Sequence, residues 1–127
     1  MARILIANDN EELLSACKEV LEGAGHVVRF VTGGALALDL AREWYPDAVL
    51  VDWKMPDTDG TVVVRALRGD PATASIPILM MSGTVRGPEI ALQAGADGFL
   101  PKPFSGRELV AAINDLLALA TKAGVPT

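Results

Sequence analysis

The sequence predicts an α/β fold in which a doubly wound, five-stranded parallel sheet carries helices on both faces. Two observations support this prediction. Five short apolar runs recur along the chain, and the longer segments between them place apolar residues at three- and four-residue spacing. Strands that alternate with helices are joined by right-handed crossovers, which produce a parallel sheet with both faces covered. The 127 residues, half of them hydrophobic, are enough for the core of one domain but not of two.

The apolar runs have the length of β-strands and span residues 4–7, 27–31, 48–51, 76–81 and 98–100. The first, third and fourth carry few or no polar side chains, as expected of central strands. The second contains Arg29 and the fifth is very short, so we place both at the edges. Pro77 is compatible with the fourth run only where it opens the strand, because no ladder hydrogen bond is lost there. We adopt the order 2-1-3-4-5 of the flavodoxin-like (βα)5 fold because it satisfies these constraints.

Four helices are expected between the runs and a fifth after the last. Their apolar positions include Leu13, Leu14, Cys17, Val20 and Leu21 in the first, Leu36, Leu40 and Trp44 in the second, and Val62, Val63, Ala66 and Leu67 in the third. The fourth, about residues 88–94, is short with a weak apolar stripe. In the fifth, Ser105 and Glu108 form a capping box before an apolar face. The period is lost near the end, so we expect a domain over residues 1–120 and a flexible C-terminal tail over residues 121–127.

Composition excludes several classes of protein. The net charge of -5 and the absence of a basic cluster argue against direct nucleic-acid binding by this domain. A single cysteine, Cys17, rules out a disulfide framework and is interpreted as a small buried apolar residue. No apolar stretch has transmembrane length, and the N-terminus reaches an acid too soon for a signal peptide. We therefore expect no membrane insertion and a cytoplasmic location.

Polar side chains follow four of the five runs. They are Asn8, Asp9 and Asn10 after the first run, Asp52 after the third, Ser82 and Thr84 at the end of the fourth, and Lys102 after the fifth. Because parallel strands all end at the same edge of a sheet, these side chains are expected to converge there, at the place where open α/β sheets bind ligands. Asp9 and Asp52 are thus predicted to lie close together, with a hydroxyl and an ammonium facing them.

This group of side chains favours phosphoryl transfer to a carboxylate. Two crowded carboxylates repel each other unless a cation lies between them, and Mg²⁺ prefers a few carboxylate or carbonyl oxygens together with waters and phosphate oxygens. Asp9, Asp52 and the backbone carbonyl of Lys54 are the expected protein ligands. The Ser82 hydroxyl and the Lys102 ammonium suit a phosphoryl group, which leaves Asp52 as the nucleophile.

The motifs ILIANDN, VDWKMPDTDG, ILMMSG and GADGFLPKPF, in this order, resemble those of a response-regulator receiver domain (CheY-like) of two-component signalling. The resemblance covers essentially the whole chain, from Arg3 to about Leu119. It implies a signalling domain that catalyses only its own phosphorylation and dephosphorylation, with Mg²⁺ as cofactor. It also implies a sensor histidine kinase or phosphotransfer protein as phosphodonor. The domain would act on a downstream protein through the face formed by helix 4, strand 5 and helix 5. Because no output domain follows, we expect a stand-alone receiver, with a receiver excised from a longer regulator as the alternative.

The resemblance also implies a role for individual residues. Asp52 is the phosphoacceptor, Asp9 the magnesium-binding acid, Ser82 the switch hydroxyl and Lys102 the lysine that pairs with the phosphate, with a cis peptide bond before Pro103. Phe99 falls where the family has an aromatic residue that moves with the switch. The positions of Lys54 and Thr84 are those that tune the lifetime of the phosphoryl group.

One position departs from the family pattern. Receivers usually carry two consecutive acids after the first strand, whereas this chain has Asn8 before Asp9. An amide oxygen can bind a metal-bound water but adds no charge, so we expect weaker but working Mg²⁺ binding. The alternative function is a phosphorylation-independent interaction domain, or pseudo-receiver, which a Mg²⁺ titration would distinguish.

Simpler interpretations hold for the neighbouring acids, and two other functions fit poorly. Asp57 and Asp59 are interpreted as turn and N-cap residues of the next helix. A haloacid dehalogenase-type hydrolase would need an acid where Lys54 stands. A flavodoxin would need a phosphate-binding loop after the first strand, where Asp9 and two glutamates would repel a phosphate.

Overall fold

The computed structural model describes residues 2–55 and 57–124, and in this part of the chain strands and helices alternate throughout. The strands are β1 (Arg3–Ala7), β2 (Val27–Val31), β3 (Ala48–Asp52), β4 (Ile78–Ser82) and β5 (Gly98–Pro101). The helices are α1 (Glu11–Gly23), α2 (Ala37–Trp44), α3 (Gly60–Gly69), α4 (Gly87–Ala94) and α5 (Gly106–Gly124). All pairings are parallel and the order is β2-β1-β3-β4-β5, which confirms the predicted fold.

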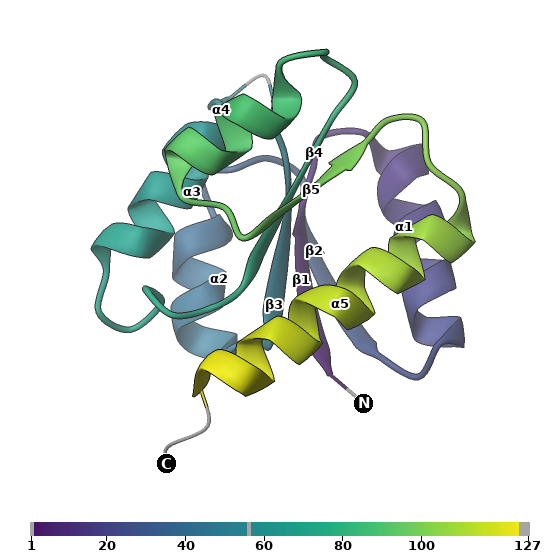
Figure 1. Cartoon of the computed structure of the whole chain (residues 1–127), viewed down its shortest axis with the longest axis horizontal. Helices are drawn as coiled ribbons and strands as arrows, with labels where there is room; N and C mark the ends of the chain where they lie inside the picture. Colours follow the sequence, from purple (N-terminus) through teal and green to yellow (C-terminus); the bar gives the residue numbers. More distant parts are fainter. Residues whose placement is uncertain (1, 56, 125–127) are drawn as a thin grey trace.

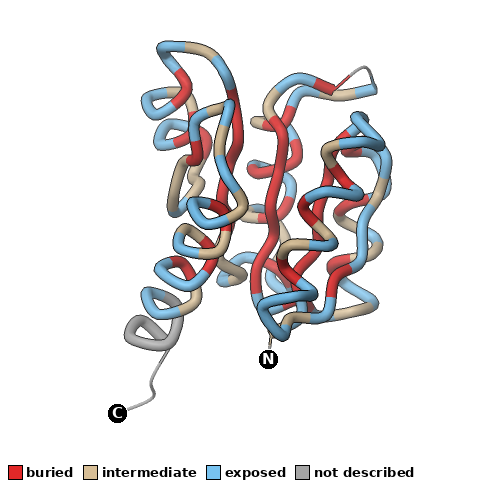
Figure 2. Tube along the Cα trace, turned by 90° about the vertical axis from the view of Figure 1, so that its right-hand side faces the viewer, coloured by how far each residue is buried: buried red, intermediate tan, exposed pale blue. Residues whose placement is uncertain are grey.

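The helices cover both faces of the sheet, with α1 and α5 on one face and α2, α3 and α4 on the other (Figure 1). Alternate residues of β1 supply the two cores. Ile4 and Ile6 pack in the cluster of α1 and α5, whereas Leu5 and Ala7 pack in the cluster of α2, α3 and α4. Every residue of β3 and β4 is buried, while β2 and β5 expose part of their length, as expected of central and edge strands (Figure 2).

Local signals in the sequence set the ends of several elements. Ser105 and Glu108 form the predicted capping box, since each side chain accepts the backbone N–H of the other at 3.1 and 2.9 Å. Pro77 lies directly before β4, and its carbonyl accepts the N–H of Val49 at 2.9 Å. A strand-opening proline is therefore compatible with the ladder, as predicted.

The C-terminal helix is longer than the loss of apolar period predicts. Helix α5 continues to Gly124, so residues 121–124 of the predicted tail are helical, and residues 125–127 lie outside the described residues. Cys17 is buried as predicted, and burial raises the pKa of its thiol to about 11. Of the helices described, none has the length and apolar character needed to span a membrane.

Arg68 on α3 ties together the connections that precede β4 and β5. Its guanidinium donates to the carbonyls of Gly95 and Ile76 at 2.9 and 2.6 Å and pairs with Oδ2 of Asp97 at 2.5 Å. The same Asp97 oxygen accepts the N–H of Ile78 at 2.9 Å. One partly buried side chain thus fixes the entry of two strands that carry the functional edge.

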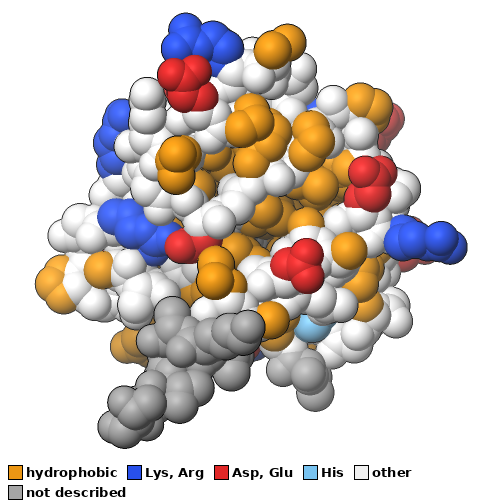
Figure 3. Space-filling view, viewed as in Figure 1, with side chains coloured by type: hydrophobic (Ala, Val, Ile, Leu, Met, Phe, Trp, Pro, Cys, Tyr) orange, Lys and Arg blue, Asp and Glu red, His pale blue; other side chains and the backbone are white. Residues whose placement is uncertain are grey.

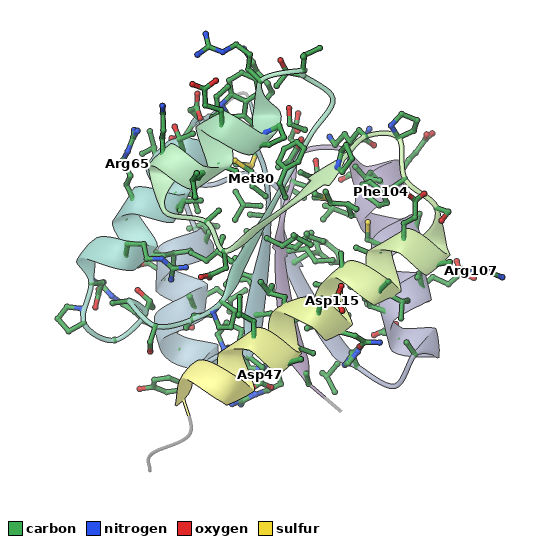
Figure 4. The ribbon with its side chains drawn as sticks, viewed as in Figure 1. Asp47, Arg65, Met80, Phe104, Arg107 and Asp115 are labelled. Atoms are coloured by element: carbon green, nitrogen blue, oxygen red, sulfur yellow. The ribbon has the colours of Figure 1, made fainter. Side chains whose placement is uncertain are left out.

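We predict that Arg68→Ala lowers the free energy of unfolding by about 2 kcal/mol, because it leaves a carboxylate and the carbonyls of Gly95, Ala74 and Ile76 without their charged donor. Urea denaturation measures the difference. Arg65→Ala is the matched control, since Arg65 lies exposed on the same helix (Figure 4). Equal stabilities of the two variants would show that the Arg68 contacts contribute nothing to folding.

Candidate functional site

Asp52 ends the central strand β3 and is 5 % exposed. The chain turns back sharply after it, and the N–H of Gly60 donates to the carbonyl of Trp53 at 2.7 Å. A Cβ on Gly60 would lie 2.9 Å from Cα of Trp53, so only glycine allows this close return. The turn leaves the Asp52 side chain at the carboxyl edge of the sheet.

Lys102 supplies the partner of this buried acid. Its Nζ lies 2.7 Å from Oδ1 of Asp52, and its backbone N–H donates to the carbonyl of Ser82 at 2.9 Å. The peptide bond between Lys102 and Pro103 is cis, as predicted. The Lys102 side chain is 30 % exposed, whereas that of Asp52 is almost entirely covered.

Opposing effects act on the pKa of Asp52. Burial raises the pKa of this carboxyl above its ordinary value, and the hydrogen bond and positive charge of Lys102 oppose the rise. The negative charge of Asp9 raises the Asp52 pKa further. Asp9 itself is exposed, so the predicted pair of carboxylates consists of one buried acid and one acid in contact with water.

Ser82 ends β4 beside this pair and is 5 % exposed. Its Oγ accepts the N–H of Thr84 at 3.1 Å, so the hydroxyl is hydrogen-bonded to the loop that follows β4. Thr84 is half-buried in that loop. Lys54 is exposed, and its ammonium lies 4.8 Å from the centre of the Trp53 ring.

Asn8 is fully buried at the end of β1. Its Oδ1 accepts the N–H of Asn10 at 3.0 Å, whereas its Nδ2 has no partner. An unpaired buried donor is costly, and sequence reasoning did not find it because the orientation of an amide depends on its surroundings. The departure from the family pattern therefore leaves a buried N–H donor next to the acids.

Phe99 on β5 is half-buried and lies against the start of α4. A Cβ on Gly87 would lie 2.5 Å from Cε1 of Phe99, so no larger residue fits there while the ring keeps this position. Gly87 is also the first residue of α4. Its fit against Phe99 depends on a contact between residues that are distant in the sequence.

The two acids that follow Asp52 act differently from each other. Asp59 is the N-cap of α3 as predicted, since its Oδ1 accepts the N–H of Thr61 at 2.8 Å. Asp57 does not cap that helix. Its carboxylate binds the connection between β2 and α2 instead, a long-range contact that turn chemistry alone does not predict.

The oxygen donors at this edge fit Mg²⁺. Among the residues the structure describes, no three His, Cys, Asp or Glu side chains gather at one point. Mg²⁺ needs no such cluster, because proteins usually bind it through one or two carboxylates while waters and phosphate oxygens complete the octahedron. Asp52 and the neighbouring Asp9 satisfy this requirement.

Comparison with known proteins agrees with this geometry. The family model of the response regulator receiver domain matches residues 4–114. The transcriptional regulatory protein CpxR of Escherichia coli strain K12 is 41 % identical over 121 residues, which are 92 % of this chain and 50 % of that protein. The chain thus spans about half the length of the curated relatives it matches.

Solved structures show the same fold. A putative response regulator from Chloroflexus aurantiacus has a TM-score of 0.88 at 34 % identity, with 92 % of this chain and 98 % of that chain covered. The receiver domain of sensor histidine kinase PA1611 from Pseudomonas aeruginosa has a TM-score of 0.85 at 28 % identity, over 92 % of this chain and 98 % of that chain. That structure holds a magnesium ion in its active site cleft.

We predict that Asp52→Asn stabilises the fold at neutral pH without Mg²⁺. Because burial raises the folded-state pKa of Asp52, the protonated carboxyl contributes stability below the unfolded pKa of about 4. That contribution is lost as the pH rises through the higher folded pKa. The advantage of the variant should therefore shrink on acidification, which urea denaturation over a pH series measures.

Asp39→Asn is the control for this series, since Asp39 is an exposed acid on α2. A lower stability of Asp52→Asn at neutral pH would contradict the prediction. It would mean that attraction to Lys102 outweighs the cost of burial.

Proposed function

Because the chain belongs to the family of response regulator receiver domains of two-component systems, we propose that it accepts a phosphoryl group on Asp52. One observation carries this proposal. A buried carboxylate at the carboxyl edge of the sheet is held 2.7 Å from the ammonium of Lys102, whose side chain is partly exposed. The acid is therefore held in a fixed position at the edge where the lysine reaches solvent.

In the proposed reaction, an oxygen of Asp52 attacks the phosphorus of a phosphohistidine. The new O–P bond forms as the N–P bond breaks, and the donor imidazole leaves with the bonding pair and takes up a proton. The ammonium of Lys102, which forms an ion pair with the Asp52 carboxylate before the reaction, then pairs with a phosphoryl oxygen. Bound Mg²⁺ would supply charge neutralisation for the phosphoryl oxygens and the carboxylates.

Asp9, Asp52 and the backbone carbonyl of Lys54 are the proposed Mg²⁺ ligands. Asn8 is proposed to act through a metal-bound water, using the lone pair of Oδ1 that the N–H of Asn10 leaves free. With one acid fewer than usual, the site should bind Mg²⁺ more weakly but still work. The retained ion pair between Lys102 and Asp52 favours this function over a phosphorylation-independent one.

Phosphorylation is proposed to act through Ser82 and Phe99. The Ser82 hydroxyl would leave the N–H of Thr84 and donate to a phosphoryl oxygen, which draws the loop before α4 toward the site. Phe99 would follow because its ring lies on Gly87, the first residue of α4. The side chains of Lys54 and Thr84 are proposed to set how fast water removes the phosphoryl group.

The face formed by α4, β5 and α5 is the proposed output surface. Hydrophobic side chains gather on this face in a hollow between β5 and α5, with Asp115 at its side (Figures 3 and 4). The hollow includes Phe99 and Leu116, so movement of the ring would change its shape. The proposed partners are a sensor histidine kinase or phosphotransfer protein as donor and a downstream protein as target, with no direct contact of this domain to nucleic acid.

With Mg²⁺ and acetyl phosphate, the wild-type protein should gain one phosphoryl group, because a small donor needs only a competent pocket. Intact-mass spectrometry measures the gain, and Asp52→Asn should show none. Chelation of Mg²⁺ by EDTA should prevent the reaction. An unmodified wild-type protein at saturating Mg²⁺ and donor would favour the phosphorylation-independent alternative.

Ser82→Ala should remove most of the phosphorylation-dependent amide shifts in α4, since the loop then has no hydroxyl to donate to the phosphoryl group. Two-dimensional ¹H–¹⁵N NMR of both proteins, before and after acetyl phosphate, tests this. Shift changes in α4 that persist in the phosphorylated variant would contradict the proposed route.

A further inference from the structure

The carboxylate of Asp57 joins two loops at the functional edge. Its Oδ1 accepts the N–H of Gly34 at 3.1 Å, and its Oδ2 accepts the N–H of Ala35 at 2.9 Å. Both donors belong to the connection between β2 and α2, 22 and 23 residues earlier in the chain. Each oxygen thus binds one of two successive backbone donors, a two-point contact that fixes orientation as well as distance.

Two glycines allow this contact. A Cβ on Gly33 would lie 2.8 and 2.9 Å from the two Asp57 oxygens, and the φ angle of Gly33 is +142°. A Cβ on Gly34 would lie 2.5 Å from Cγ2 of Val63 on α3. The backbone at Gly33 and Gly34 therefore lies directly against Asp57 and Thr58 of the loop after β3, in a way that larger residues would prevent.

The loop that Asp57 holds is the one that carries the proposed Mg²⁺ carbonyl. Its base is closed by the bond from the Gly60 N–H to the Trp53 carbonyl and by the antiparallel bridge between Lys54 and Asp59. Asp57 lies away from this base, between Lys54 and Asp59 in the sequence. The two backbone hydrogen bonds that its carboxylate accepts lower the pKa of that carboxyl below the ordinary range. The loop is thus closed at its base by its own backbone and bound through Asp57 to the connection between β2 and α2.

We propose that Asp57 is a positioning residue for the phosphoryl-transfer site, which holds the loop after β3 so that the Lys54 carbonyl and Asp52 keep the spacing that Mg²⁺ requires. This inference rests on the proposed function. Mg²⁺ demands a nearly ideal octahedron, so a loop that is free to move at one end binds it less well. Groups that orient metal ligands commonly affect metal affinity although they do not touch the metal.

The test is a Mg²⁺ titration followed by ¹H–¹⁵N NMR, with the amides of Asp9, Trp53 and Lys54 as reporters. Asp57→Ala should raise the Mg²⁺ dissociation constant about tenfold. The Gly34 and Ala35 amides should shift and lose protection from solvent exchange. Asp57→Asn should weaken Mg²⁺ binding less than Asp57→Ala does, because its amide keeps one of the two acceptor oxygens.

Asp59→Asn controls for charge, since it removes one carboxylate from the same loop and leaves an N-cap residue. Urea denaturation verifies that each variant is folded. Wild-type affinity in a folded Asp57→Ala whose Gly34 and Ala35 amides are exposed would overturn the proposal. An equal loss in Asp59→Asn would also overturn it, because the loss of a charge from the loop would then explain the effect.

The wild-type titration distinguishes a failure of this inference from a failure of the proposed function on which it rests. Mg²⁺-dependent shifts in the wild type, with unchanged affinity in Asp57→Ala, would refute only the positioning role. A wild type that shows no such shifts would refute the proposed Mg²⁺ site and the role of Asp57 with it.

Discussion

A single ion pair determines how the functional edge is built. The Asp52 side chain is almost entirely buried. A charged carboxylate buried in this way without a partner destabilises the fold by several kcal/mol. Lys102, which follows β5 on the far side of β4, provides the partner. Its backbone N–H donates to the carbonyl of Ser82 at the end of β4. The connection after β5 must therefore pass over the carboxyl edge of the sheet. This brings Ser82 and the loop before α4 beside the buried acid.

The same edge balances charge against accessibility. Asp9 is exposed and Lys102 partly so, whereas Asp52, Ser82 and Asn8 are buried. Charged groups that reach water can meet a cation or pair with a phosphoryl oxygen without a large desolvation penalty, and the buried groups hold fixed positions. Among the buried side chains that the structure describes, the amide of Asn8 is the one with a donor that has no partner. It marks the point where this chain departs most clearly from the family pattern.

Much of this arrangement could be predicted from the sequence. Runs such as residues 48–51 are apolar because both faces of a central strand are covered, so the order of the strands and the convergence of their ends follow from local pattern. The pairing of Asp52 with Lys102 was predicted from that convergence, and the structure brings the two together.

What the sequence did not predict depends on contacts between residues far apart in the chain. The partners of Asp57 and of Arg68, the fit of Phe99 on Gly87 and the orientation of the Asn8 amide all belong to this class. The last turn of α5 was missed for a different reason. A helix can continue beyond its apolar stripe because backbone hydrogen bonds, rather than side-chain burial, extend it by each further residue.

The central claim is that the buried acid of this pair is the group that is phosphorylated, and chemical trapping tests it most directly. Borohydride reduces an aspartyl phosphate to homoserine, so the modified residue can be located by fragment-ion mass spectrometry after acetyl phosphate treatment. The account predicts homoserine at position 52 and at no other acid of the site. Homoserine at Asp9, Asp57 or Asp59 would contradict it, as would a phosphorylated protein in which Asp52 remains unchanged.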